Sequence, residues 1–288
     1  MLNLLIPLNL LFLISAHGIL AQSAIIGNVV DENRNPIAFA NIYLKGKPIG
    51  TTTDERGFFS LDMNDAIEAT DSLMITHISY EVAIYPIHAA LEEKEFRLKE
   101  SKHYDLAEIE LQVATSKNQI ELGASQKSSN HFIQNNTYES YQIAALIKNT
   151  SSKSGYLKAI KVYISGLGNT DDPIRIKLYD FDSLCNCPGQ LLLKRDLLIK
   201  KVHKGWNTIK LSEYYIDLPA DRFFVVYEWL FSKQQQSLQK SHALGMVSND
   251  DQSLTLEKIG DDKWHRNKLL HVKHLKLLIR VTAAVYDR

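Results

Sequence analysis

Short runs in which apolar and polar residues alternate cover most of the chain, and polar turn segments separate them. Ile25–Val30 and Ile37–Leu44 are examples, and alternation over so few residues is typical of half-buried strands. Turn signals recur about every 8–12 residues, which favours an all-β sandwich. Before residue 115, no segment shows a convincing helical period. The expected strands of this part are 25–30, 37–44, 51–53, 58–61, 72–78, 82–87, 95–98 and 108–113.

The clearest local signal is the polar turn inside Gly50–Leu61, which separates two β-prone runs. Asp54 suits the first position of a type I turn, and Gly57 suits the left-handed position that closes it. The segment contains no nucleophile, no set of metal ligands and no phosphate-binding loop. It therefore indicates a β-hairpin and carries no reaction of its own.

The β pattern resumes in the second half of the chain. Ile174–Tyr179 alternates strictly, and Phe223–Leu230 is apolar enough for a buried central strand. Residues 114–150 are polar at first and then contain Ile143–Ile147, a five-residue run that fits a strand or a short helix equally well. We therefore expect a linker and lead-in segment over 114–150, followed by a second, jelly-roll-like β-sandwich over 151–288.

The N-terminal segment differs from everything that follows it. Leu2–Leu20 is almost wholly apolar, and Ile19–Ala21 resembles a signal-peptidase site. A secretory signal peptide over 1–21 is therefore predicted, with Gln22 as the first residue of the mature chain. Because no Lys or Arg precedes Arg34, a retained membrane anchor is the competing interpretation. No second apolar run is long enough to span a membrane, so no transmembrane span is expected after cleavage.

Several short motifs follow one another in the first third of the chain. They read Ile25-x-Gly27-x-Val29-x-Asp31, Pro36-Ile37-x-x-Ala40-x-Ile42, Gly50-Thr-Thr-Thr-Asp-x-x-Gly57-x-Phe59-x-Leu61, Asp71-x-Leu73-x-Ile75-Thr-His-Ile78-Ser79-Tyr80 and Leu106-x-Glu108-Ile109. In this order they resemble the carboxypeptidase-like regulatory domain of exported Bacteroidota proteins, over residues 22–113. The resemblance implies a transthyretin-like (prealbumin-like) β-sandwich, in the periplasm or associated with the cell surface or outer membrane. Ser79 stands where the family usually has glycine.

Charge and motif content restrict the possible function classes. The chain has 33 basic and 33 acidic side chains, so its formal net charge is +0 and no nucleic-acid partner is expected. The sequence lacks His-x-x-Glu, Gly-x-Ser-x-Gly, Walker A and Gly-x-Gly-x-x-Gly motifs. We therefore predict a non-catalytic interaction module without catalytic residues, metal or cofactor. The alternative is an envelope hydrolase whose site is assembled from scattered residues of the C-terminal sandwich.

Candidate binding residues gather near the C-terminus. Lys263–Arg280 contains several cations and no acid, which suits an anionic glycan, lipopolysaccharide or an acidic protein; a hairpin with a basic solvent face is the competing interpretation. Trp206 and Trp264 follow turn residues and could stack on sugar rings; alternatively, both could be buried in the core. Trp229 is predicted to be a core residue. The candidate ligand patch comprises Trp206, Trp264, Lys263, Arg266 and Lys268, with a glycan or an envelope protein as partner.

Two loop features allow both a chemical and a structural interpretation. Cys185 and Cys187 are the only cysteines, and they either form a small ring in an oxidising compartment or remain two loop thiols. Asp180 and Asp182 offer oxygen ligands of the kind that calcium takes, but turn capping is the favoured prediction. The sequence carries no signal for an oligomeric state.

Overall fold

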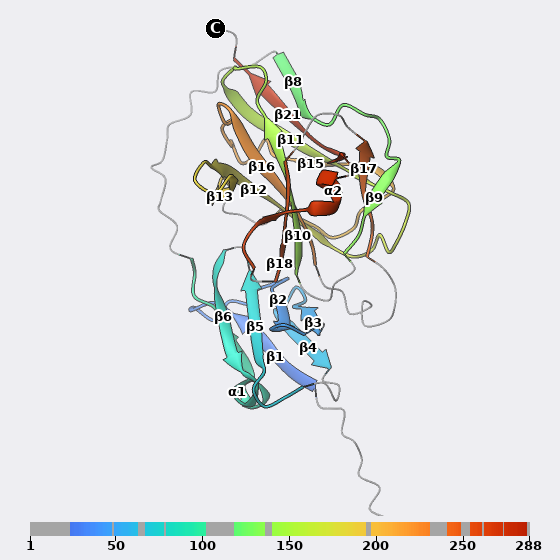
Figure 1. Cartoon of the computed structure of the whole chain (residues 1–288). Coiled ribbons are helices and arrows are strands. Elements are labelled where there is room, and N and C mark those ends of the chain that lie inside the picture. The colour runs from blue at the N-terminus through green and yellow to red at the C-terminus, as the bar shows by residue number, and fades with distance from the viewer. Residues whose placement is uncertain are drawn as a thin grey trace, which may run out of the picture.

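Two β-rich domains follow one another along the chain, and the computed structural model shows them stacked end to end (Figure 1). Strands dominate both, and each consists of two sheets around an apolar core, so the predicted all-β sandwich class is confirmed. The structure describes residues 24–47, 49–62, 67–77, 79–101, 118–135, 140–193, 197–230, 241–248, 254–260, 262–272 and 274–286.

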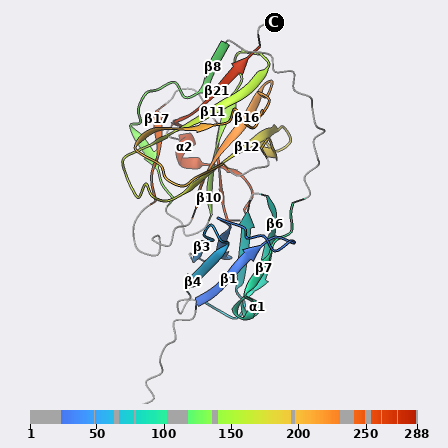
Figure 2. The same ribbon diagram turned by 180° about the vertical axis from the view of Figure 1, so that it is seen from behind.

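The first domain packs a three-stranded sheet against a four-stranded sheet. The order β4-β1-β7 comprises Phe58–Asp62, Ala24–Val30 and Glu95–Arg97, and these strands face the viewer in Figure 2. The order β3-β2-β5-β6 comprises Gly50–Thr52, Asn41–Leu44, Ser72–His77 and Tyr80–Pro86, after which the short helix α1 covers Ile87–Glu92. The alternating residues Ile25 and Val29 of β1 point into the core, where they meet Phe59 and Phe96.

The predicted turn after β3 is present. The Asp54 carboxylate accepts hydrogen bonds from the N–H groups of Arg56 and Phe58 at 2.9 and 3.0 Å. Gly57 has φ 75°, and a Cβ atom there would lie 2.6 Å from the carbonyl oxygen of Val29. Glycine is therefore required both by the backbone angle and by the close approach of β1.

The second domain packs two seven-stranded sheets, here called the β16 sheet and the β11 sheet. The β16 sheet has the order β13-β12-β16-β10-β18-β19, with β14 beside β12; the bounds are Cys187–Leu191, Ile174–Asp182, Arg222–Trp229, Tyr141–Lys148, Thr255–Ile259, His265–Arg266 and Leu197–Ile199. The β11 sheet has the order β20-β17-β11-β21-β8, with β15 beside β11 and β9 beside β17; the bounds are Leu275–Leu277, Leu244–Ser248, Gly155–Ile164, Ile279–Val285, Asn118–Gly123, Gly205–Lys210 and His131–Ile133. Helix α2 covers Lys268–Val272.

The core of the second domain lies between the two sheets. Inward-facing side chains of β16, such as Phe223 and Val225, pack there with Leu157 and Ile160 of β11. As predicted, the apolar run at 223–230 is a central strand, because β12 and β10 flank it on both sides. Trp229 is 1% exposed, which confirms its predicted core position.

Several elements differ from the sequence-based expectation. Residues 114–150 were expected to be a linker and lead-in segment, but β8, β9 and β10 within them are integral strands of the second sandwich. Ile87 begins helix α1 instead of ending a strand, and α2 lies inside the basic segment. Both helices are too short to show a 3.6-residue period, so pattern reading could not find them.

Some predictions fall on residues that the structure does not describe. These are the signal peptide over 1–21, the mature start at Gln22 and the strand at 108–113. Among the residues that are described, neither helix has the length and apolar character needed to cross a membrane.

Candidate functional site

The β16 sheet carries a second apolar cluster on the face that points away from the sandwich core. Phe224 and Val226 alternate with the core-facing residues of β16 and therefore lie on this outer face. Ala144 of β10 is paired with Val226 on one side and with Leu256 of β18 on the other. We call the whole group the outer aromatic cluster: buried Ala144, Phe224, Val226 and Leu256, with partly buried Leu146, Tyr179, Phe181, Cys187, Leu254 and Trp264.

The partly exposed aromatic rings of this cluster come from opposite sides of the central strand β16. Trp264 precedes the edge strand β19, yet its ring lies edge-on to that of Tyr179 of β12, with centroids 6.5 Å apart. Phe181 stacks on Phe224 at 6.0 Å, and the guanidinium of Arg222 lies 4.8 Å from the Phe181 ring. Burial raises the pKa of the Tyr179 hydroxyl further above its ordinary value of 10. The outer face thus presents ring edges and faces beside one cation.

Three of the predicted cations accompany Trp264 in the chain and in space. Lys263, Arg266 and Lys268 are all exposed. The segment is positioned by pairing of β19 with β18, and Asn267 anchors its end by donating a 2.7 Å hydrogen bond to the Glu257 carboxylate. Four of the five predicted patch residues therefore lie in one short exposed stretch.

The fifth predicted residue, Trp206, lies in a different cluster on the β11 sheet. Its ring packs edge-on against Tyr163 at 5.5 Å, and the guanidinium of Arg280 lies 4.2 Å above it. The indole N–H donates to the carbonyl of Lys127 at 2.9 Å. Arg280 is itself held by the carbonyl of Ala124 and its neighbours. The Trp206 indole therefore already contacts a cation, a second ring and a backbone carbonyl. It lies in a different cluster from Trp264, so the structure does not bring the two tryptophans together.

A buried ionic cluster that sequence reasoning missed lies beside the outer aromatic cluster. The Glu228 carboxylate accepts a hydrogen bond from Arg175 and forms an ion pair with Lys177, each at 3.1 Å, and also accepts the Ser140 hydroxyl at 3.1 Å. Burial raises the pKa of Glu228, but the two cations lower it by more, so the net shift is downward. A single acid inside the apolar run of β16 was the available signal in the sequence.

The ionic cluster also joins the two domains. Asn41 of β2 donates to Glu228 at 3.1 Å, and Arg175 donates to the carbonyl of Phe39 at 2.6 Å. Phe39 has φ 57°, an uncommon angle for a bulky residue. An exposed ion pair between Lys200 and Glu55 adds a further link. The first domain is therefore docked on the outer face of the β16 sheet, next to the outer aromatic cluster.

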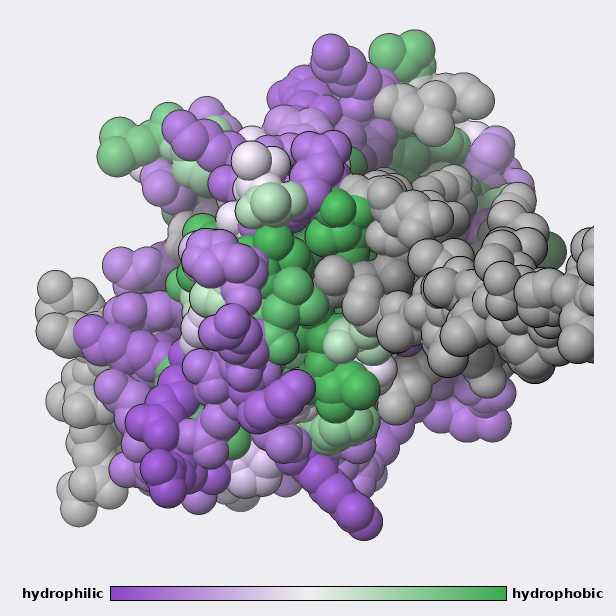
Figure 3. All heavy atoms as spheres, turned by 90° about the horizontal axis from the view of Figure 1, so that it is seen from below, coloured by the Kyte–Doolittle hydropathy of each residue, from purple (hydrophilic) through white to green (hydrophobic). Residues whose placement is uncertain are grey.

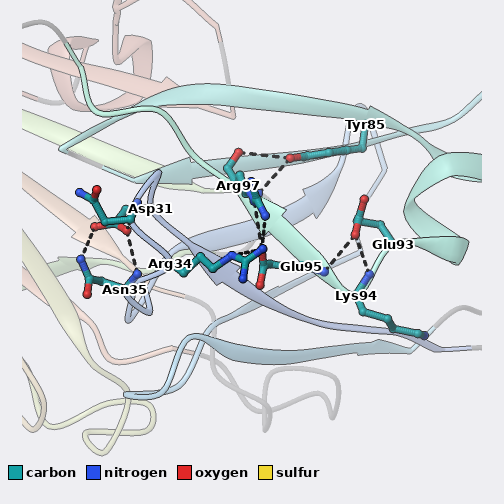
Figure 4. A network of polar contacts seen from close by, with 9 residues as sticks. Asp31, Arg34, Asn35, Tyr85, Glu93, Lys94, Glu95 and Arg97 are labelled. Carbon is teal, nitrogen blue, oxygen red and sulfur yellow. Dashed lines mark hydrogen bonds and ion pairs between the residues drawn. The ribbon is translucent and has the colours of Figure 1, made fainter.

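A shallow depression of about 250 Å³ on the first domain is lined by polar side chains (Figure 4). The Tyr85 hydroxyl bridges the N–H and the carbonyl of Arg97, both at 3.2 Å. Arg97 donates to Glu95 at 2.8 Å, and Arg34 approaches the same carboxylate at 3.7 Å. The Glu93 carboxylate accepts backbone N–H groups of the chain that follows it. The polar groups that line the depression therefore bond to one another and to nearby backbone, as expected of a network that holds β6, β7 and the nearby turn together.

The first domain also exposes large apolar side chains. Ile26, Val82, Ile84 and Leu91 are 42–54% exposed. Seen from below, hydrophobic residues form a band between hydrophilic ones (Figure 3). Exposed apolar patches are typical of interaction surfaces when they are contiguous.

A buried histidine lies in the core of the second domain. His242 is buried, hydrogen-bonded to the Tyr227 hydroxyl, and its carbonyl accepts the Trp229 indole N–H at 3.0 Å. Burial lowers the pKa of His242 to about 4. The pair lies inside the protein and offers no surface to a substrate. Within the part of the chain that the structure describes, no three His, Cys, Asp or Glu residues are arranged to hold a metal ion.

The two loop predictions have clear structural outcomes. Cys185 and Cys187 form a disulfide. The Asp182 carboxylate accepts the N–H of Leu184 at 2.8 Å, and that of Asp180 accepts an N–H of the returning strand at 2.6 Å, which confirms turn capping.

Comparison with known proteins gives a match to one family model and similarity to several solved structures, two of which are described here. Residues 25–111 match the model of the CarboxypepD_reg-like domain, which confirms the resemblance seen in the motifs. The clostridial cysteine protease Cwp84 after propeptide cleavage is 10% identical, with a TM-score of 0.44 over 83% of this chain and 51% of that chain. The cysteine protease and lectin-like domains of Cwp84, a surface layer associated protein of Clostridium difficile, are 8% identical, with a TM-score of 0.41 over 83% and 45%.

This chain thus spans about half the length of the two solved chains. Identities and scores this low carry no argument about function. No curated protein matches the chain.

Proposed function

Because residues 25–111 match the model of the CarboxypepD_reg-like domain, we propose that this protein is an exported, non-catalytic binding protein of a Bacteroidota cell envelope. In this proposal the second domain binds a glycan at the outer aromatic cluster. The observation that carries it is the meeting of Trp264 and Tyr179 over the outer face of the β16 sheet, beside exposed Lys263, Arg266 and Lys268.

The chemistry of this surface suits an acidic sugar chain. An indole ring stacks on the apolar C–H face of a pyranose, and exposed cations attract carboxylate or sulfate groups. Burial raises the pKa of the neighbouring Tyr179 hydroxyl, which therefore adds no negative charge to this area. The absence of a global charge bias in the chain means that any such attraction must come from this local group.

The first domain has a positioning role in the proposal. Its docking through Glu228, Asn41 and Arg175 places it next to the binding surface. Any other orientation would leave the Glu228 carboxylate without the Asn41 amide and Arg175 without the Phe39 carbonyl, so these buried hydrogen bonds favour the observed orientation. The regulatory domain is thus expected to present the second domain to the envelope in a defined orientation.

The proposal of export has two supports. The apolar segment over 1–21 has the composition of a signal peptide. The Cys185–Cys187 disulfide is a bond that proteins form in oxidising compartments. Cell fractionation of the native protein, with N-terminal sequencing, tests this: a mature chain beginning at Gln22 in the periplasmic or outer-membrane fraction is expected. An intact N-terminus in the cytoplasm contradicts it.

The binding proposal is tested on an array of neutral and acidic glycans with residues 22–288. We expect binding to the acidic members of the array, and we expect high salt to weaken it. Trp264→Ala is expected to weaken binding by about fivefold or more, taking the roughly 1–3 kcal/mol that one aromatic side chain contributes to base stacking as the scale for a stacked sugar ring. Trp206→Ala is the matched control and retains binding, since its indole is already engaged by Arg280 and Lys127.

Two results contradict the proposal. The first is an absence of binding across the array. The second is equal loss in the Trp206 and Trp264 variants when both remain folded by circular dichroism. Shortened glycans in the reaction mixture, detected by mass spectrometry, would instead favour the envelope hydrolase.

A further inference from the structure

The hairpin between β12 and β13 ends in a disulfide that encloses a single residue. Cys185 and Cys187 are joined, and Asn186 between them has φ 54°. Cys185 and Asn186 are exposed, and the adjacent Leu184 is 95% exposed. Cys187 is half-buried and packs against the outer aromatic cluster. The two cysteines of the bridge therefore differ: one is open to solvent and the other is partly sheltered.

The hairpin is held together without this bridge. Asp182 and Cys187 are already paired in the antiparallel ladder. The Asp182 carboxylate accepts the N–H of Leu184 at 2.8 Å, and the Asp180 carboxylate accepts the N–H of Gln190 at 2.6 Å. A disulfide stabilises mainly by restricting the unfolded chain, and the effect falls with the length of the enclosed loop. A ring of three residues is at the short end of that scale, so a purely structural role is a poor explanation for it.

We propose that Cys185–Cys187 is a redox-active disulfide that exchanges with a dithiol. Exposed disulfides are the labile ones, and attack requires only that a thiolate reach one sulfur. The incoming thiolate attacks the Sγ of Cys185, the S–S bond breaks, and Cys187 leaves as a thiolate that takes up a proton. The second thiol of the partner, as its thiolate, then attacks the mixed disulfide and releases Cys185, which is protonated in turn. The bridge gains two electrons and two protons, and the dithiol is oxidised to a disulfide.

Accessibility of the bridge is tested by reduction of the native mature chain with dithiothreitol. Samples are alkylated at intervals, and the peptide that contains both cysteines is followed by mass spectrometry, in native buffer and in denaturant. The expected native rate lies within about tenfold of the denatured rate, because an exposed disulfide needs no unfolding before attack. A native reduction rate more than about tenfold below the denatured rate overturns the proposal.

The assignment of the attacked sulfur is tested with single variants. Cys187→Ser leaves the exposed Cys185 thiol, and Cys185→Ser leaves the sheltered Cys187 thiol. With glutathione disulfide as probe, Cys187→Ser is expected to form the mixed disulfide at least about tenfold faster, since access governs exchange. Equal rates, or a faster Cys185→Ser, overturn the assignment.

A structural role is excluded or established with the double variant. Cys185→Ser/Cys187→Ser is expected to keep the midpoint of urea denaturation of the oxidised wild type, because the ladder and the aspartate contacts remain. A substantially lower midpoint means that the bridge serves stability, and the redox proposal then fails.

Discussion

Single residues decide several features of this protein through backbone geometry and burial. Gly57 is fixed by a positive φ angle and by the approach of Val29, whereas Gly46 has a similar φ of 73° with open space around it. His242 shows the other kind of constraint, because a group that titrates near neutrality in water is kept neutral by burial. Both constraints lead to measurable consequences.

The two glycines form a matched pair for substitution. Ala at either position meets the strain of a left-handed backbone, about 1–2 kcal/mol. In Gly57→Ala the new methyl group also meets the Val29 carbonyl, so a larger loss of unfolding free energy is expected than in Gly46→Ala. Urea denaturation of the two variants measures the difference. Equal losses would show that the close approach of β1 is unimportant.

The burial of His242 predicts a dependence of stability on pH. Its folded pKa is about 4, below its ordinary 6.5, so between these values the unfolded state binds the proton and the folded state does not. The stabilisation is complete above pH 6.5 and is lost as the pH falls towards 4, by about 3 kcal/mol in total. Denaturation curves of wild type and His242→Gln across this range test it; parallel curves would contradict it.

Elements of the second domain are defined by pairing between segments far apart in the chain. β10 lies between β16 and β18, and β8 forms an edge beside β21. Both precede residue 151, where the local pattern placed the start of the sandwich. The five-residue run at 143–147 fitted a strand and a short helix equally well. A central strand that is buried on both faces is apolar throughout, so its sequence shows no alternation. Its identity became clear only from its neighbours.

This arrangement predicts where the second domain can be cut. A chain beginning at residue 114 retains β8 and β10 and is expected to fold, with dispersed amide resonances in solution. A chain beginning at residue 151 lacks β10, leaving the inner edges of β16 and β18 unpaired, and is expected to aggregate or remain unfolded. A folded 151–288 fragment would contradict this account.

At the scale of the whole molecule, a few buried charges determine how the domains are joined. Glu228 is 1% exposed; it contacts Arg175 and Lys177 of its own domain and Asn41 of the first domain. It therefore takes part both in the second domain and in the contact between the domains. The proposed binding surface and the redox-active bridge both lie on the same sheet as this cluster. The domain contact is therefore expected to affect both.

Removal of the central charge tests the buried ionic cluster at this contact. Glu228→Gln leaves two buried cations without a counter-ion and is expected to lower the unfolding free energy by about 3–5 kcal/mol. Glu55→Gln, at the exposed interdomain pair with Lys200, is the control and should change little, since exposed pairs contribute little. Urea denaturation measures both. A small effect of Glu228→Gln would show that water or rearrangement compensates the charges.

The sequence by itself determined the all-β class, the resemblance of the first domain to the carboxypeptidase-like regulatory domain, the turn at Asp54–Gly57 and the grouping of Lys263, Trp264, Arg266 and Lys268. These features depend on neighbours in the chain: alternation, turn chemistry and local composition. Only the tertiary structure decided that Trp264 meets Tyr179, that Trp206 belongs elsewhere, and that Glu228 joins the domains. The physical reason is that sheet pairing brings together side chains separated by tens to hundreds of residues, and no local pattern encodes those partners.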